Sequence, residues 1–131
     1  TGFGLLGHLS QMLIASNQLI TNKNIAPLRI ELYASKIPIL NGAFHFYDQG
    51  FSSTLTPSNS DALKFLESKN EEEPPINLIL GSIQCGSRMH QGILNLIVDP
   101  QTCGPLVISC SKDIACELET VGPWKIIGEV L

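Results

Sequence analysis

Basic residues are scarce in this sequence. Lys and Arg together number eight, against 12 Asp and Glu, so the formal net charge is −4 and the pI is about 5.2. Proteins that bind nucleic acid directly carry a basic patch that neutralises phosphates, and no such cluster occurs here. The composition therefore argues against nucleic acid as a direct partner.

Long apolar runs are absent as well. No run approaches the roughly 20 residues that a membrane span requires, and no basic segment followed by an apolar stretch marks a secretory signal. We therefore expect a cytoplasmic protein that does not associate with membranes. The sequence opens with Thr1 rather than Met, so we expect it to be a piece of a longer protein.

The cysteines lack the spacing of a metal site. None of the four forms a C-x2-C pair, and no His follows at a zinc-finger spacing. Free thiols in an intracellular protein fit this pattern better than a disulfide framework, and most such thiols are buried as small apolar side chains. At 131 residues, 44% of them hydrophobic and 15% charged, the chain has the size of a single domain with its own core.

The apolar pattern predicts helices and strands mixed along the chain. A stripe formed by Leu5, Leu9, Met12 and Leu13 indicates an amphipathic helix, which we expect to end at Asn17. Further helices are predicted from Pro38 to Gly50, over 60–66 and over 112–120, strands over 28–33, 106–110 and 124–130, and loops over 52–59 and 71–75. Residues 76–98 fit either type, with a helix favoured before Asp99. This mixture predicts an α/β fold, a layered α+β sandwich.

A glycine-rich segment opens the chain. Gly2-Phe3-Gly4-Leu5-Leu6-Gly7 matches G-x-G-x-x-G and leads into a helix, where backbone N–H groups and the helix dipole favour an anion or phosphate. A dinucleotide site would also need an acid about 20 residues downstream, and the first acid is Glu31. A plain glycine turn is the stronger interpretation of this pattern alone. His8, taken by itself, is more often a packed or capping residue than a functional one.

Four segments resemble one enzyme family. Thr1-Gly2-Phe3-Gly4-Leu5-Leu6-Gly7-His8-Leu9 is similar to the TGFGLLGHL segment of selenophosphate synthetases, and the segment from Asp99 to Leu106 resembles their DPQTSGGLL segment. Between them, residues 37–43 resemble the LPLLPGA stretch, and residues 127–130 resemble the closing IGEV. The four segments occur in the family's order and span nearly the whole chain.

This resemblance implies a fold and an activity. It implies the C-terminal domain of the aminoimidazole-ribonucleotide-synthetase-like superfamily, a mixed sheet covered by helices and partly like a ferredoxin fold. Residues 1–131 would form that single domain, and the N-terminal domain that holds ATP and forms the homodimer would precede it. The implied reaction converts ATP, selenide and water into selenophosphate, AMP and phosphate, with Mg²⁺ as cofactor. The isolated domain is expected to be inactive, because the reactive Cys or Sec and most magnesium-binding acids belong to the N-terminal domain.

The resemblance also assigns residues to a site. Thr1, Gly2, Phe3 and Gly4 would line the phosphates when the two domains meet, and His8 matches the family's histidine. Asp99, Thr102, Cys103 and Gly104 would form a second turn. No catalytic residue and no metal ligand is expected within the chain, since a further metal-binding Asp of the family precedes the position of Thr1.

The second segment departs from its family. Cys103 replaces the usual Ser, and Pro105 replaces the second Gly, which restricts the backbone and removes one N–H donor. A nucleophilic role for Cys103 finds no nearby base or cation in the sequence, and Asp99 and Thr102 are expected to cap the turn.

Three hypotheses remain at this point. The first is an enzyme domain, within a longer protein that includes, in some relatives, an oxidoreductase. The second is a degenerate domain of the same fold that serves only as a structural or interaction module, which the changes at 103 and 105 favour. The third is a purine-synthesis or hydrogenase-maturation branch, which the Phe-Gly-Leu-Leu-Gly-His continuation disfavours.

Overall fold

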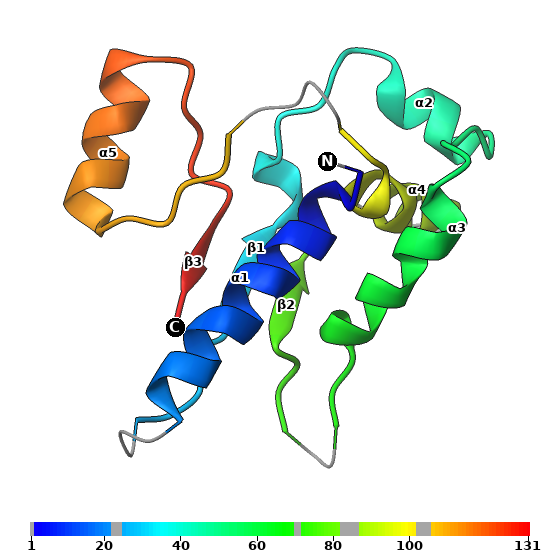
Figure 1. The fold of residues 1–131 in the computed structure, drawn as a ribbon. Helices are drawn as coiled ribbons and strands as arrows, with labels where there is room; N and C mark the ends of the chain where they lie inside the picture. Colours follow the sequence, from blue (N-terminus) through cyan, green and yellow to red (C-terminus); the bar gives the residue numbers. More distant parts are fainter. Residues whose placement is uncertain (1, 22–24, 70–71, 82–86, 102–105) are drawn as a thin grey trace.

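A three-stranded mixed sheet organises the fold, in a computed structural model that describes residues 2–21, 25–69, 72–81, 87–101 and 106–131 (Figure 1). Its strand order is β2 (Ile76–Ile79), β1 (Ile30–Tyr33) and β3 (Gly128–Val130). β1 pairs in parallel with β2 and antiparallel with β3, so that Ile30 lies opposite both Ile76 and Val130. The parallel pair requires a crossover connection, which residues 34–75 supply with short helices. The predicted α/β class, with a mixed sheet and helices, is confirmed.

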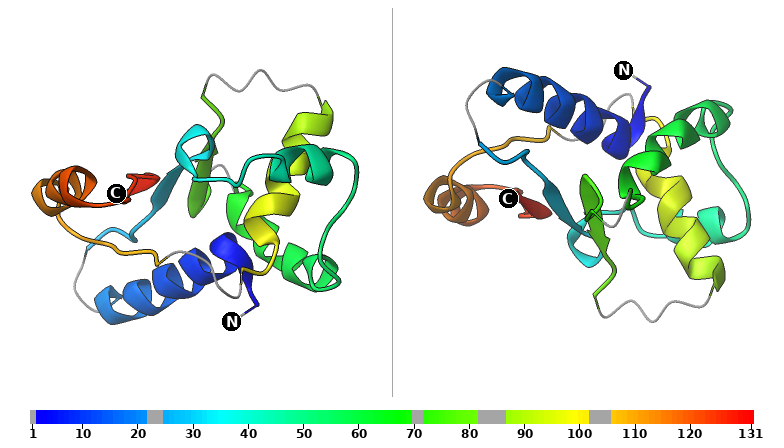
Figure 2. Two further views of the ribbon diagram at one scale, coloured as in Figure 1. Left: turned by 90° about the horizontal axis from the view of Figure 1, so that it is seen from above. Right: turned by 90° about the horizontal axis from the view of Figure 1, so that it is seen from below.

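Helix α1 (Gly4–Ile20) packs along one side of the sheet (Figures 1 and 2). Its buried face consists of Leu6, Leu9, Ser10 and Leu13, at the i, i+3, i+4, i+7 spacing of one helical stripe. The buried face differs from the predicted stripe by part of a helical turn. Leu9 and Leu13 are buried as predicted, whereas Met12 is 42% exposed and Leu5 is only half-buried. The core joins this face to both β1 and β2 and to α4 (Ser87–Val98), through Ile30, Leu32, Ile76, Ile93, Ile97 and Val98.

The predicted helix end at Asn17 is wrong. α1 continues to Ile20, and its C-cap Thr21 is right-handed rather than left-handed. The Asn17 side chain turns instead to Leu28, where its Nδ2 donates to the carbonyl oxygen at 3.0 Å and its Oδ1 accepts from the backbone N–H at 2.8 Å. This double hydrogen bond ties the end of α1 to the segment that enters β1.

The second helix begins later than predicted. Residues 38–40 are not helical, and α2 (Ala43–Asp48) begins after Gly42, whose φ of 88° is left-handed. Leu40 is 85% exposed, so it does not share the predicted apolar face. The expected stop at Gly50 is confirmed, with φ of 86° just after the helix. Phe44 and Tyr47 are half-buried, and α2 packs on α4.

The Ser- and Thr-rich segment is not entirely a loop. It contains the short helix α3 (Thr56–Asn59), with Pro57 in its first turn, where a missing N–H costs nothing. A 3₁₀ helix, η2 (Ser60–Leu66), follows without a break and takes the place of the helix predicted over 60–66. Residues 76–98, ambiguous in the sequence, contain both β2 and α4, and α4 ends directly before Asp99 as favoured.

The C-terminal part departs most from expectation. Residues 106–110 belong to no strand, and Leu106 and Ile108 are 70% and 46% exposed. The segment pairs with none of the three strands of the sheet, although Val107 packs against the core. Helix α5 (Lys112–Val121) agrees with its prediction, but the strand predicted over 124–130 is reduced to β3. Figures 1 and 2 show α5 beyond β3, on the opposite side from α2, α3 and α4.

The exposure of the cysteines and the apolar character of the helices bear on two predictions from the sequence. Cys110 and Cys116 are exposed free thiols, contrary to the predicted burial, and Cys85 and Cys103 lie outside the described residues. Within the described ranges, none of the helices has the length and apolar character needed to cross a membrane.

Candidate functional site

The glycine-rich segment forms the beginning of α1 rather than a loop before it. Gly2 and Gly4 adopt φ values of 96° and 71°, which L side chains rarely adopt, and the helix already includes Gly4 to Gly7. Phe3 at the N-cap makes no side-chain capping hydrogen bond, and the first turn holds no acidic residue. The N–H groups of this turn therefore have no side-chain acceptor at the N-cap.

Two of the four family-like segments, Thr1–Leu9 (the first) and Asp99–Leu106 (the second), come together at this helix end. A Cβ added to Gly4 would lie 2.6 Å from both the carbonyl carbon and the carbonyl oxygen of Val98, so the first segment is in direct backbone contact with the residue that immediately precedes the second. Val98 is fully buried and Asp99 is 7% exposed. The fold thus brings the start of the second segment close to the first, although β1, α2, α3, β2 and α4 separate them in the chain.

Asp99 is a centre of hydrogen bonding. Its Oδ1 accepts from the Ser53 backbone N–H at 3.0 Å and from the Thr56 hydroxyl at 2.7 Å, and its Oδ2 accepts from Gln101 Nε2 at 3.3 Å. Thr56 is itself 4% exposed. The carboxylate therefore binds the segment leading into α3 and the side chain of Gln101, and the expected capping of its own turn stays a prediction.

Tyr47 joins the same cluster from α2. Its hydroxyl donates to the Asp99 carboxylate. Burial is the largest cause of a raised pKa of Tyr47, followed by this hydrogen bond and the negative charge of Asp99, while the hydrogen bond with Gln101 acts in the opposite direction. The phenol is therefore held in its neutral, donating form.

Asn59 contacts the first segment and the residue that immediately precedes the second. Its Nδ2 donates to the Gly2 carbonyl oxygen at 2.7 Å and to the Val98 carbonyl oxygen at 2.8 Å. Sequence reasoning missed Tyr47, Ser53, Thr56 and Asn59 as site residues. The available signal was weak: a Ser/Thr/Asn-rich stretch with one Pro, which is typical of turns and of helix N-termini alike.

His8 lies on the first turns of α1, half-buried. Its ring meets the Phe3 ring edge-on, with centroids 5.7 Å apart. A shallow pocket of about 260 Å³ adjoins this aromatic pair, and it is lined by Phe3, Gly7, Gln11, Ser58, Asn59, Asp61 and Ala62. Of the residues predicted to form the wall, Phe3 lines this pocket, and Gly2 and Gly4 are the neighbours of Phe3 in the sequence.

Several predicted site residues lie outside the described residues: Thr1, Thr102, Cys103 and Gly104, together with Pro105. Among the residues that the structure does describe, no group of three His, Cys, Asp or Glu side chains is placed to hold a metal ion. The described part of the site therefore offers backbone donors, amides, hydroxyls, the His8 imidazole, the engaged carboxylate of Asp99 and the exposed carboxylate of Asp61.

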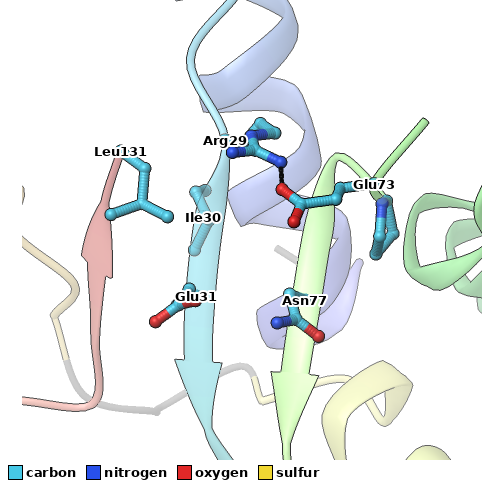
Figure 3. A pocket seen from close by; sticks show the side chains of 7 residues that line it. Arg29, Ile30, Glu31, Glu73, Asn77 and Leu131 are labelled. Atoms are coloured by element: carbon cyan, nitrogen blue, oxygen red, sulfur yellow. Dashed lines mark ion pairs between the residues drawn. The ribbon is translucent and has the colours of Figure 1, made fainter.

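A second pocket, of about 270 Å³, lies at the sheet (Figure 3). Figure 3 shows the Arg29 and Glu73 side chains pointing toward each other, and they form an ion pair. Glu31 and Asn77, on the neighbouring strands, also line it. Because its lining shares no residue with either family-like segment and its cation is already paired, we do not assign the site to this pocket.

Curated relatives match nearly the whole chain. A protein named selenide, water dikinase from Clostridium botulinum (strain Eklund 17B / Type B) is 28% identical over 100% of this chain and 32% of its own length. Proteins of the same name from Campylobacter jejuni and Clostridioides difficile are 35% and 30% identical over 89% and 99% of this chain, and 25% and 29% of their own lengths. The chain thus spans about a third or less of the relatives it matches.

Two further comparisons give no match: no family model and no solved structure matches the chain. The specific likeness to an aminoimidazole-ribonucleotide-synthetase or ferredoxin-like fold therefore stays a prediction. The curated relatives confirm the resemblance that the four sequence segments predicted, and we identify this chain as a relative of the selenophosphate synthetases, the selenide, water dikinases.

Proposed function

We propose that this chain is the C-terminal domain of a longer selenophosphate synthetase and forms one wall of its ATP and phosphate site. The whole enzyme would convert ATP, selenide and water into selenophosphate, AMP and phosphate in the cytoplasm, as a homodimer built by N-terminal domains. The 131-residue domain alone would be inactive, because the relatives it matches are three to four times its length.

The meeting of the two family-like segments carries this proposal. Gly4 contacts the Val98 backbone directly, at the N-terminal end of a 17-residue helix. A helix N-terminus attracts negative charge through its free N–H groups and its dipole. With neither a side-chain cap nor an acid in the first turn, the N-terminus of α1 is suited to accept an external anion such as a phosphate.

The domain's own residues would bind and orient rather than react. Backbone N–H groups of the first turn of α1 would hold phosphate oxygens, and His8 would add one donor beside them. Mg²⁺ supplies charge neutralisation in phosphoryl transfer. Because the described residues include no cluster suited to a metal ion, we derive no step through Mg²⁺ here and expect its ligands in the N-terminal domain.

A structural module is the second candidate. Its support is the engagement of Asp99, whose two oxygens accept hydrogen bonds from Ser53, Thr56 and Gln101, all within the domain. The sequence changes at Cys103 and Pro105 point the same way. Under this hypothesis the chain folds and holds an interface without contributing to chemistry.

The test uses the native full-length protein. We would measure AMP formed from ATP with and without selenide and identify selenophosphate by ³¹P NMR. The variant His8→Leu, which removes the donor, is expected to lower kcat/KM about tenfold, the equivalent of one hydrogen bond to a charged group at about 1.5 kcal/mol. His45→Leu is the matched control, because His45 is exposed and bonds only to Gln49 among the hydrogen bonds described.

Absence of selenide-dependent AMP from a folded wild-type protein would overturn the proposed activity and favour the structural module. Equal kcat/KM values for the two histidine variants would instead remove His8 from the wall and leave the activity intact.

A further inference from the structure

The two family-like segments are bound at their junction by side chains from elsewhere in the fold. Gly2 precedes α1 and Val98 ends α4, and both expose backbone carbonyl oxygens at the junction between the segments. The side chain that binds both carbonyls, Asn59, and one of those that bind the adjacent Asp99 carboxylate, Thr56, come from a third element, the short helix α3.

Two side chains of α3 face this junction. Thr56 and Asn59 are three residues apart, the spacing that places helical side chains on one face. The Thr56 hydroxyl donates to Asp99 Oδ1 at 2.7 Å, and Asn59 Nδ2 donates to the Gly2 and Val98 carbonyl oxygens at 2.7 and 2.8 Å. One helical turn therefore binds both segments at once.

The chemistry of the Asn59 contacts is specific. Both partners are carbonyl oxygens, which only accept hydrogen bonds, so they require the two N–H groups that a single amide nitrogen carries. No other neutral side chain of this size supplies two donors from one atom. An aliphatic residue at position 59 would leave two carbonyls in the part-buried junction without these donors, at a cost beyond the lost bonds themselves.

We infer that Asn59, assisted by Thr56, is a positioning residue for the phosphate wall: it fixes the backbone of Gly2 relative to the turn that begins at Val98. The inference rests on the proposed function, since it assumes that these two segments together face the phosphates of ATP. Asn59 touches no phosphate in this role. It sets the spacing of the backbone donors that do, and displacement of a binding group by about 1 Å lowers rate or affinity by up to about a hundredfold.

The experiment compares Asn59→Leu with Asn95→Leu in the native full-length protein. Asn95 is an asparagine of α4 whose described hydrogen bond is an exposed one from Gln91, so it controls for the loss of an amide elsewhere in the domain. Asn59→Gln, which keeps both N–H groups but shifts them by one methylene, is the milder second variant. Thermal denaturation and circular dichroism establish which variants are folded at the assay temperature.

Two readouts separate positioning from a loss of folded protein. The first is the KM for ATP and the KM for selenide in the AMP-forming assay. The second is the Kd for MgATP, titrated without selenide. We expect Asn59→Leu to raise the KM and Kd for ATP about tenfold with the selenide KM within about twofold, and Asn59→Gln to shift them in the same direction by less. A merely structural role would lower kcat through loss of active protein and leave the ATP constants unchanged.

Each outcome decides the inference. Unchanged ATP constants in a folded Asn59→Leu protein, or an equal rise in Asn95→Leu, overturn it; if Asn59→Leu does not fold, Asn59→Gln decides by the same criterion. If the wild-type protein binds MgATP but makes no AMP from selenide, the proposed activity fails and the Kd values alone judge the positioning role. A wild-type protein that binds no MgATP overturns both.

Discussion

Replacement of Gly4 by Ala tests whether the two family-like segments are in contact as described. The substitution adds one Cβ at a backbone φ of 71°, which costs an L residue about 1–2 kcal/mol. The same Cβ would stand 2.6 Å from the Val98 carbonyl carbon and oxygen, well inside the 3.4–4 Å of ordinary contact. Since those atoms are backbone of a buried helix end, they move only with α4, at an overpacking cost of about 1–3 kcal/mol.

The two costs together predict a loss of about 2–5 kcal/mol from the free energy of unfolding, against a total of about 5–15 kcal/mol for a typical domain. Urea denaturation followed by circular dichroism measures it. With an m value near 2 kcal/mol/M, the midpoint should fall by about 1–2.5 M.

Gly50→Ala is the matched control. Gly50 has a similar φ of 86°, and a Cβ added there would meet no atom within 4 Å. This variant should therefore lose only the backbone cost of about 1–2 kcal/mol. Equal midpoints for the two variants would refute the contact between Gly4 and Val98, and with it the junction on which the candidate site depends.

Two further predictions concern residues outside the glycine segment. Asn17→Ala removes both hydrogen bonds to Leu28 and should lower the free energy of unfolding by about 1–3 kcal/mol in urea denaturation, whereas Gln18→Ala, on the exposed face of α1, should change it by no more than about 0.5 kcal/mol; similar losses would show that the Asn17 bonds contribute nothing. Both tyrosines should ionise at a higher pH than free tyrosine. The hydrogen bond to Glu129 is the main cause that raises the pKa of Tyr33 to about 12, and burial is the main cause that raises the pKa of Tyr47. Because the folded pKa exceeds the unfolded value of about 10, each tyrosine's contribution to stability is complete below pH 10 and is lost as the pH rises above it. A spectrophotometric titration at 295 nm should show no tyrosinate step near pH 10 in the folded protein and two in urea, and a full step near pH 10 in the folded protein would contradict the assigned contacts.

Local sequence patterns predicted those elements whose signals are local. The α1 and α5 helices, the strand at Ile30–Tyr33 and the end of α4 before Asp99 all follow from periodicity and from terminating residues. Four short segments in a fixed order were sufficient to indicate a resemblance to the selenophosphate synthetases, and the curated proteins that match nearly the whole chain bear that family's name. Of the residues predicted for the candidate site, Gly2, Phe3, Gly4, His8 and Asp99 are described and the rest lie outside the described residues; their role in a phosphate site stays a prediction.

Tertiary contacts decided what local patterns could not. The Asn17 side chain forms two hydrogen bonds with the Leu28 backbone, so a residue suited to end a helix instead lies inside one. The segment 106–110 has the apolar composition of a strand, yet it pairs with none of the three strands of the sheet. Pairing is a property of the neighbours available in space, which a periodicity of two does not encode.

The junction itself is the clearest case. The sequence alone determined that a helix starts in the glycine-rich segment and that another ends before Asp99-Pro100, because glycine and proline impose their backbone limits locally. That Gly4 lies against Val98, and that Thr56 and Asn59 bind both segments, was decided only by the packing of α1, α3 and α4, since hydrogen bonds between distant parts of the chain depend on where the fold places them.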